Sequence, residues 1–157
     1  MKPLLRSATA ADSPRIADLL ISTRTAFMPY APSAHSEDDV RAWVASQLVP
    51  TGGVVVAEVN ERVVGAMATA VEGAASWITQ MAVEPSLVGN GIGTHLLAHA
   101  LGALNLPMRL YTFQQNIGAR RFYERHGFVA IEFTDGQDNE ERCPDVLYEF
   151  RSRRTEA

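Results

Sequence analysis

Three alternating glycines between an apolar run and a helical pattern restrict the possible folds more than any other feature of this sequence. Residues 88–97 read VGNGIGTHLL, with glycine at positions 89, 91 and 93. Glycine is costly to order and is a poor helix former, so this spacing indicates a turn with a special purpose. Backbone N–H groups at a helix start attract anions, because that end carries about half a positive charge. We therefore expect a phosphate or pyrophosphate here, and a tight turn that needs only positive φ angles is the alternative.

Two familiar nucleotide-binding patterns do not fit the turn. The dinucleotide pattern G-x-G-x-x-G needs glycine where this chain has Thr94, and an acidic residue about 20 positions later. Residues 110–115 read LYTFQQ and contain no acid. A P-loop would need lysine before its Ser or Thr, whereas this turn ends in GTH. The pattern that remains is an anion held mainly by backbone groups.

The order of elements predicts one mixed sheet with helices on its faces, which is an α/β fold class. Seven apolar or β-branched runs have the length of strands: residues 3–8, 53–59, 62–72, 75–85, 108–113, 128–133 and 145–150. Four segments repeat apolar side chains at helical spacing: residues 14–27, 36–50, 93–104 and 116–127. Two-residue links at 60–61 and 73–74 predict antiparallel neighbours, and the helical crossover from 75–85 to 108–113 predicts a parallel pair.

Several residues are placed to begin or end these helices. Thr9 and Ser36 each precede an aspartate by three positions, as in a capping box, although Asp12 or Ser13 could cap the first helix instead. Asn116 is placed to cap the fourth helix, and Gly127 to end it in a left-handed conformation. The tail, residues 151–157, is expected to fray.

Composition excludes several classes of protein. The 157 residues suit one domain, and a formal net charge of −4 gives no basic footprint for nucleic acid. The N-terminus lacks the apolar core of a signal peptide, and no apolar run approaches 18 residues, so we expect a cytoplasmic protein without a membrane span. A lone cysteine, Cys143, rules out an intrachain disulfide. His95 and His99 stand four apart, but Leu96 replaces the glutamate of a zinc motif, so we expect no metal.

Two stretches together resemble the GCN5-related N-acetyltransferases, the GNAT family. The family signature Gln/Arg-x-x-Gly-x-Gly/Ala compares with residues 88–93, VGNGIG, preceded by MAVEP at 81–85. About 25 residues later, NIGARRFYERHGF at 116–128 is similar to the family's second signature. The order of elements also agrees, so the resemblance covers nearly the whole chain. The departure is Val88, which stands where the family has Gln or Arg beside the pyrophosphate; losing that hydrogen bond would cost about 1.5–3 kcal/mol at most.

This resemblance implies a single acetyltransferase domain over residues 1–157, with a central mixed sheet of about seven strands flanked by about four helices. It implies a cytoplasmic, bacterial-type enzyme that moves the acetyl group from acetyl-CoA to an amine by direct attack in a ternary complex, without a metal. The acceptor would be a small amine, a protein N-terminus or a lysine, with no nucleic acid or membrane partner, and the chain could form a homodimer. A non-catalytic acyl-CoA-binding regulatory module on the same fold is the alternative.

The resemblance also assigns roles to residues. Tyr123 would be the general acid that protonates the CoA thiolate, since a phenol of pKa about 10 is protonated at pH 7; from helical spacing alone it could be part of a core stripe. The cofactor-binding positions would be Met81, Ala82, Val83, Gly89, Asn90, Gly91, Ile92, Gly93, Thr94, Asn116, Ala119 and Tyr123. Backbone N–H groups near 81–83 would stabilise the oxyanion.

The acceptor side is less defined by the sequence. Residues expected to line it are Met28, Tyr30, His35 and Trp77, of which Trp77 could equally be core. Polar candidates for a general base are Glu72, Gln80, Glu84, Glu132 and His35. Many members of the family use a chain of water molecules instead, so a direct base is not required.

Overall fold

Seven strands form one mixed sheet in the computed structural model, which describes residues 2–152. The strands are β1 (Leu4–Ser7), β2 (Val54–Val59), β3 (Arg62–Glu72), β4 (Ala75–Val83), β5 (Met108–Phe113), β6 (Val129–Thr134) and β7 (Asp145–Phe150). Their order across the sheet is β1-β2-β3-β4-β5-β7-β6. Every neighbouring pair is antiparallel except β4 and β5, which are parallel. The predicted mixed sheet and its one parallel crossover are confirmed.

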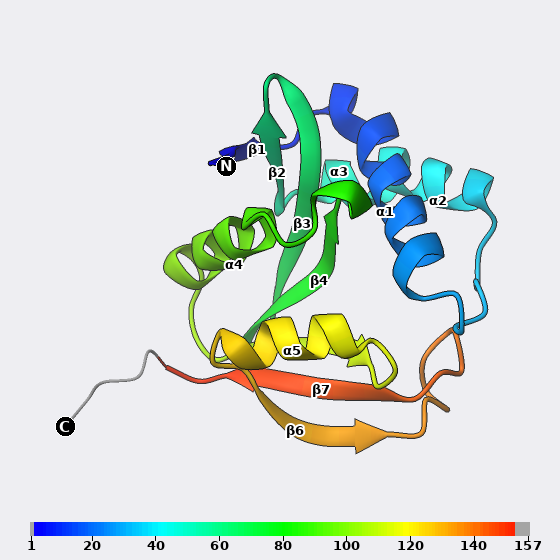
Figure 1. Cartoon of the computed structure of the whole chain (residues 1–157), viewed down its shortest axis with the longest axis vertical. Helices are drawn as coiled ribbons and strands as arrows, with labels where there is room; N and C mark the ends of the chain where they lie inside the picture. The colour runs from blue at the N-terminus through cyan, green and yellow to red at the C-terminus, as the bar shows by residue number, and fades with distance from the viewer. Residues whose placement is uncertain (1, 153–157) are drawn as a thin grey trace.

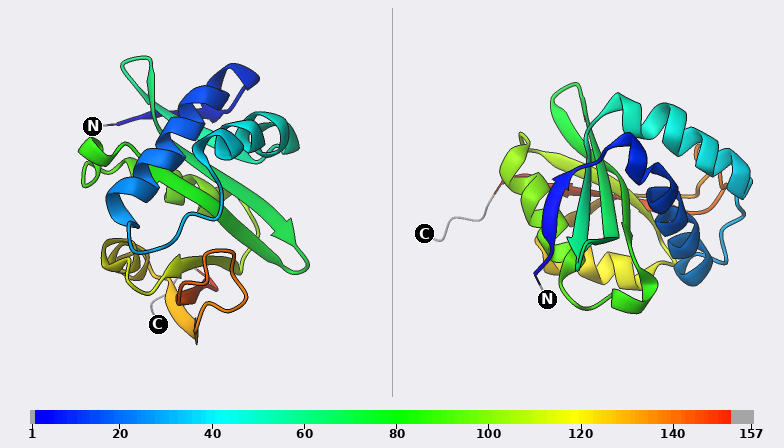
Figure 2. Two further views of the ribbon diagram at one scale, coloured as in Figure 1. Left: turned by 90° about the vertical axis from the view of Figure 1, so that its right-hand side faces the viewer. Right: turned by 90° about the horizontal axis from the view of Figure 1, so that it is seen from above.

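Helices cover both faces of this sheet (Figure 1). They are α1 (Ser13–Phe27), α2 (Glu37–Trp43), α3 (Val49–Thr51), α4 (Ile92–Ala103) and α5 (Ile117–Arg125), with 3₁₀ turns at Ala10–Asp12 and Pro85–Leu87. Seen from above, α1 and α2 lie on one side of the sheet and α4 on the other (Figure 2, right). Ile16, Leu19 and Val44 belong to the core on the α1 side, and Leu96 and Leu97 of α4 belong to the core on the opposite side.

The second predicted helix, 36–50, is interrupted in the structure. Between α2 and α3 the backbone makes a π turn over Val44–Leu48, in which the amide of Val49 bonds the carbonyl of Val44. Pro50 follows directly and has no N–H group, and its ring would crowd the carbonyl four residues earlier in a regular helix. The wider turn accommodates this proline inside the helical run, so Pro50 does not end the helix as its sequence suggested; the helical run ends at Thr51.

Two of the predicted caps begin their helices as expected, and the predicted Thr9–Asp12 capping box is present at the start of a 3₁₀ turn rather than of α1. The Ser36 hydroxyl accepts from the amide of Asp39 at 3.1 Å, and the Asn116 side chain accepts from the amide of Ala119 at 3.2 Å. Thr9 precedes the short 3₁₀ turn, so Asp12 takes the N-cap position of α1. The Asp12 carboxylate accepts from the Thr9 amide at 2.8 Å, which ties the end of β1 to the start of α1.

Strands β4 and β5 part soon after they meet. They pair only at Ser76 with Met108 and at Trp77 with Arg109, although β4 continues to Val83 and β5 to Phe113. On its other side, β4 pairs with β3 as far as Val83, and this ladder contains a one-residue bulge at Thr79. The sheet is therefore continuous on the β3 side of β4 and unpaired on its β5 side beyond Trp77. We call this unpaired stretch between β4 and β5 the gap.

The end of α5 is locked by the backbone conformation of Gly127. Its φ is +94°, its amide bonds the carbonyl of Glu124 at 3.1 Å, and the amide of Phe128 bonds the carbonyl of Tyr123 at 3.0 Å. This pair of bonds is the Schellman arrangement, which a hydrophobic contact usually accompanies. Here the rings of Tyr123 and Phe128 meet at 5.6 Å between centroids. The predicted glycine end of the helix is confirmed, and it fixes Tyr123.

The described residues contain no helix that is long and apolar enough to cross a membrane. Of the tail expected to fray, Arg151 and Ser152 follow β7 without regular structure, and 153–157 lie outside the described residues.

Replacing Gly127 by alanine tests whether its left-handed conformation holds the end of α5. The new Cβ would lie 3.0 Å from Phe150 and would sit on a left-handed backbone, so we expect about 1–3 kcal/mol of lost stability in urea denaturation. Gly118→Ala on the same helix is the control, because its Cβ would meet nothing within 4 Å and its φ is not positive. That variant should be neutral or more stable by up to about 1 kcal/mol. Equal losses in the two variants would contradict a special role for Gly127.

Candidate functional site

The three glycines of the turn before α4 serve two different purposes. Gly89 and Gly91 have φ angles of +92° and +87°, and a Cβ on either would meet nothing within 4 Å. These two positions need glycine for its backbone angles rather than for space. Gly93 lies inside α4, and a Cβ there would approach the Phe122 ring of α5 at 3.3 Å. Its small size lets α4 and α5 approach each other.

The start of α4 presents backbone N–H groups without protein partners. Gly91 is the N-cap residue and provides no side chain to cap the helix. The first helical amide with a backbone partner is that of His95, which bonds the Gly91 carbonyl at 3.1 Å. The amides of Ile92, Gly93 and Thr94 therefore point out of the helix end, where an anion is stabilised by them and by the helix dipole.

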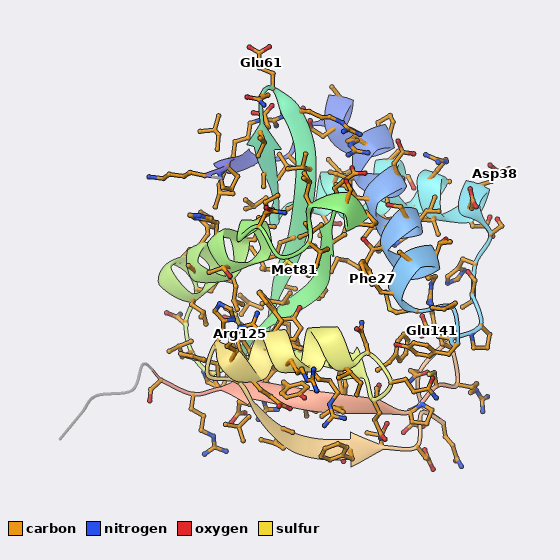
Figure 3. The ribbon with its side chains drawn as sticks, in the orientation of Figure 1. Phe27, Asp38, Glu61, Met81, Arg125 and Glu141 are labelled. Atoms are coloured by element: carbon orange, nitrogen blue, oxygen red, sulfur yellow. The ribbon has the colours of Figure 1, made fainter. Side chains whose placement is uncertain are left out.

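His126 lies beside this helix start. Its Nδ1 is 2.8 Å from the carbonyl oxygen of Phe122, which can only accept, so Nδ1 carries the hydrogen. Its Nε2 is 3.1 Å from the Thr94 hydroxyl, which donates to it while the ring is neutral. Figure 3 shows Arg125, the neighbour of His126, at the end of α5 nearest α4. His126 thus supplies an imidazole beside a turn whose own residue Val88 is 54% exposed and apolar.

The edge of β4 that faces the gap carries backbone N–H groups. The amide of Glu84 bonds the carbonyl of Val64 on β3 at 2.8 Å. Because backbone groups alternate in direction along a strand, the amide of Ala82 also points to β3, and those of Met81 and Val83 point away from it. Strand β5 has already separated at this level. Met81 and Val83 therefore offer two donors to the gap, and the Ala82 amide serves the sheet instead.

Tyr123 lies on the α5 side of the gap, in an aromatic cluster. Its ring contacts those of Phe122, Phe128 and Tyr148, with centroids 5.1, 5.6 and 6.3 Å away. Only 7% of the residue is exposed, and burial raises the pKa of its phenol far above the ordinary value. The hydroxyl therefore stays protonated at every pH at which the protein would work. A buried, protonated phenol beside a gap can donate a proton to a leaving group.

Aromatic side chains line the opposite face of the gap. Trp77 of β4 stacks on Tyr111 of β5 with centroids 5.8 Å apart and planes 19° apart. Tyr30, from the loop between α1 and α2, meets Phe113 of β5 edge-on at 6.2 Å. Of the residues expected on the acceptor side, Tyr30 and Trp77 thus lie against the same strand.

The other two expected acceptor residues lie farther out. The His35 ring nitrogen is 3.0 Å from a carboxylate oxygen of Glu140, and more than half of both side chains is exposed. This contact places His35 at the rim, where the α1–α2 loop meets segment 134–144. Met28 is half-buried directly after α1. A second contact, the ion pair between Arg24 and Glu141, joins α1 itself to segment 134–144.

The structure separates the candidates for a general base. Glu84 is paired with Arg15 and lies 3.6 Å from Arg62, so its charge is already matched. Glu72 stands at the end of β3 opposite Ala75, at the far end of the hairpin from the open part of β4. Gln80 is half-buried on β4, but an amide is not a base. Glu132 is exposed on β6. None of these places a free carboxylate between β4 and β5.

The structure gives no cluster of metal ligands over residues 2–152. Cys143 is buried, and burial with the charges of Glu141 and Asp145 raises the pKa of its thiol, which makes it a poor nucleophile.

Sequence reasoning missed three residues of this site. Tyr111 and Phe113 follow Arg109 at two-residue spacing on β5, and that alternation signals a shared face. The third is His126. Its contact with Thr94 joins two helices, and nothing local in the sequence signals it.

Comparisons with known proteins agree with this geometry. A family model described as the acetyltransferase (GNAT) family matches residues 20–128. No curated protein matches the chain. The solved structure of apo YjaB from Escherichia coli superposes with a TM-score of 0.76 at 19% identity, covering 96% of this chain and 98% of that one.

Two further solved structures contain ligands. The PaiA N-acetyltransferase of Thermoplasma acidophilum, in complex with coenzyme A, has a TM-score of 0.76 at 16% identity and covers 97% of this chain and 100% of its own. Arabidopsis thaliana Naa50, in complex with the bisubstrate analogue CoA-Ac-MVNAL, has a TM-score of 0.72 at 20% identity, with coverage of 97% and 100%. At these identities the likeness shows the fold.

The dependence of the free energy of unfolding on pH, measured above pH 10, should show whether the Tyr123 hydroxyl is buried. Above about pH 10 the unfolded chain releases this phenolic proton and the folded chain keeps it, so the folded state binds more protons and the free energy of unfolding falls as pH rises. We expect Tyr123→Phe to flatten that fall in urea denaturation above pH 10, by an amount that approaches about 1.4 kcal/mol per pH unit near pH 11.5. Tyr111→Phe, at a half-exposed ring, should flatten it less. An unchanged slope in Tyr123→Phe would contradict the burial of the hydroxyl.

Proposed function

We propose that this chain, which belongs to the acetyltransferase (GNAT) family, transfers an acetyl group from acetyl-CoA directly to an amine within a ternary complex. The observation that carries the proposal is the gap between β4 and β5 beside the uncapped start of α4. The gap offers a slot for an extended thioester arm, and the helix start offers donors for a pyrophosphate. The whole of residues 1–157 would act as one acetyltransferase domain.

The pyrophosphate of acetyl-CoA would bind to the turn at 89–94, mainly through backbone groups. The donors are the free amides of Ile92, Gly93 and Thr94, with Gly89 and Asn90 shaping the turn. The Asn90 side chain donates to the Leu87 carbonyl at 3.0 Å and thereby holds the turn in place. This supports cofactor binding without the Gln or Arg that Val88 replaces. Asn116 and Ala119 would meet the cofactor from the first turn of α5.

The reaction needs one bond formed and one broken. A free amine attacks the thioester carbonyl, the new N–C bond forms, and the C–S bond breaks to release CoA. An amine similar to lysine has a pKa of about 10.4, so it arrives as an ammonium ion and its proton must leave first. Water in the gap would carry that proton to solvent, and the sulfur would gain one. The products are an amide, CoA and one proton released overall.

Two features of the chain would lower the barrier to this step. The amides of Met81 and Val83 face the gap and would stabilise the oxyanion that forms on the thioester oxygen, an effect worth a few kcal/mol. Tyr123 would donate its proton to the departing sulfur. The low-dielectric surroundings that raise the phenol's pKa would also raise that of the departing thiol, so the proton would move to the sulfur as the C–S bond breaks, and the tyrosinate left behind would regain a proton from water in the gap.

Other parts of the assignment stay predictions. They are the cytoplasmic location, the bacterial type and the absence of nucleic acid, membrane and metal from the reaction. A homodimer also stays a prediction, for which the exposed apolar side chains of the edge strand β6 offer a surface.

Removing the Tyr123 hydroxyl separates chemistry from binding. We expect Tyr123→Phe to lower kcat at least tenfold in a CoA-release assay, because the sulfur loses its proton donor while the ring stays packed. The dissociation constant for acetyl-CoA, measured by calorimetry, should change less than threefold. An unchanged kcat would remove Tyr123 from the mechanism. Tight binding of acetyl-CoA by the wild-type chain without turnover of any amine would favour a regulatory acyl-CoA-binding module instead.

The backbone of the turn should matter more than its side chains. Gly91→Ala adds no steric contact but forces a non-glycine residue to a φ of +87°, which costs about 1–3 kcal/mol and disturbs the amides that follow. We expect its acetyl-CoA dissociation constant to rise at least tenfold. Gly102→Ala, in the same helix with open space around it, is the matched control and should bind normally. Equal affinities in the two variants would contradict binding at this turn.

A further inference from the structure

Four aromatic rings form a wall on the face of the gap away from Tyr123. We name them the aromatic wall: Trp77, Tyr111, Phe113 and Tyr30. Trp77 is the last β4 residue that pairs with β5, and Tyr111 stands two residues beyond its partner Arg109. Their stacked rings therefore bridge the two strands at the point where these separate. Leu110, whose side chain points the other way, packs in the core that contains Tyr123. The wall and Tyr123 thus face the gap from opposite sides of the sheet.

The wall is open to a ligand. Tyr111 is 52% exposed, an unusual state for a ring at the centre of a sheet, and Trp77 is only half-buried. Stacked rings offer a flat apolar surface whose faces carry partial negative charge. Such faces bind apolar stems and cations, and they bind carboxylates poorly.

The carboxylates near the aromatic wall that act on Tyr111 have no ion-pair partner among the described residues. Burial, followed by the charges of Asp145 and Glu132, raises the pKa of the Tyr111 hydroxyl, and Arg109 acts in the opposite direction. Strand register explains this, because Tyr111 and Glu132 both pair with Leu147 and so share its face of the sheet. Glu132 is exposed, and it forms no ion pair with any residue that the structure describes.

The two arginines that border the wall are already matched by carboxylates. The Arg109 guanidinium donates to Glu149 at 2.7 Å, and Arg24 is paired with Glu141. The other terminal nitrogen of Arg24, Nη1, is buried and has no hydrogen-bond partner, so it is closed to solvent. An anionic ligand on the wall would therefore find neither Arg109 nor Arg24 as a free, accessible partner.

We propose that the acceptor is a cationic primary amine without a carboxylate, whose apolar stem lies on Trp77 and Tyr111. This inference rests on the proposed acetyl transfer. The ammonium group is drawn by the negative field of Glu132 and Asp145 and by the ring faces, and it loses its proton to water before attack. A carboxylate on the same molecule would be desolvated beside those acids with no partner, which selects against free amino acids.

Matched pairs of acceptors test the substrate class. Tyramine and tyrosine differ only by the carboxylate, as do cadaverine and lysine. We expect kcat/KM in the CoA-release assay to favour the amine at least 100-fold in both pairs. Equal rates, or a preference for the amino acids, would overturn the proposal and would point to Arg24 as a carboxylate site.

Direct binding separates this inference from the proposed function. The chain has two tryptophans, and Trp43→Phe leaves Trp77 as the only one. In that variant, saturated with CoA, tyramine should change Trp77 fluorescence with a midpoint at least tenfold below that for tyrosine. Binding of acetyl-CoA is measured separately by calorimetry, so its failure alone would reject the acetyl transfer. A normal acetyl-CoA isotherm with no fluorescence response to tyramine or cadaverine would overturn the aromatic wall as the acceptor site.

Variants of the wall distinguish a binding role from a structural one. Tyr111→Leu removes a half-exposed ring and should raise KM for tyramine at least tenfold with kcat and acetyl-CoA affinity nearly unchanged; Tyr111→Phe restores the ring and should restore KM. Glu132→Gln should raise KM about threefold at low salt and less at 0.5 M salt. Glu61→Gln, at the tip of the β2–β3 hairpin far from β6 (Figure 3), is the charge-matched control and should change nothing. A Glu61→Gln effect as large as that of Glu132→Gln, or an unchanged KM in Tyr111→Leu, would overturn the proposal.

Discussion

The separation of β4 from β5 after two residue pairs is the constraint on which the site depends. Strands that stop pairing leave backbone groups without partners, and such groups are costly when they are buried. Strand β4 limits the cost by keeping its ladder to β3 through Val83, while the bulge at Thr79 changes which of its amides face the gap. Without this shift, the amides of Met81 and Val83 would point into the β3 ladder. The donors that face the gap are therefore set by one irregularity in one strand.

Contacts between α4 and α5 determine what surrounds the gap. Gly93 lets the Phe122 ring lie against α4, and His126 joins the end of α5 to Thr94 at the start of α4. The left-handed Gly127 ends α5 immediately after these contacts and packs Phe128 on Tyr123. The anion-binding turn and the phenol are consequently held by the same helix pair. A loss of packing between these helices would disturb the turn at 89–94 and the position of the Tyr123 phenol together.

Local signals in the sequence were enough for the order of elements, the caps at Ser36 and Asn116, and the glycine end of α5, because each depends on residues a few positions apart. The sequence predicted the glycine turn before α4, but it did not predict that the glycines of this turn have different roles. Gly91 is explained by its own φ angle, whereas Gly93 is explained by Phe122, which lies on another helix. The interruption at Pro50 could have been inferred from proline chemistry, but its π turn could not. The length of the β4–β5 ladder and the stacking of Trp77 on Tyr111 depend on tertiary structure, and no local pattern in the sequence predicts them.

The two faces of the sheet differ in their chemistry, and the gap between β4 and β5 connects them. The α4–α5 side offers free amides, His126 and a protonated phenol, which suit an anionic cofactor and its leaving group. The α1–α2 side offers exposed rings and unmatched carboxylate charge, which suit a cation. A continuous sheet would keep two such ligands about 10 Å apart, the thickness of one packed layer, and no bond could form. Where β4 and β5 separate, a nucleophile from one face can reach a carbonyl held from the other. Under the proposed function, the opposite charges would keep each ligand on its own side until they meet.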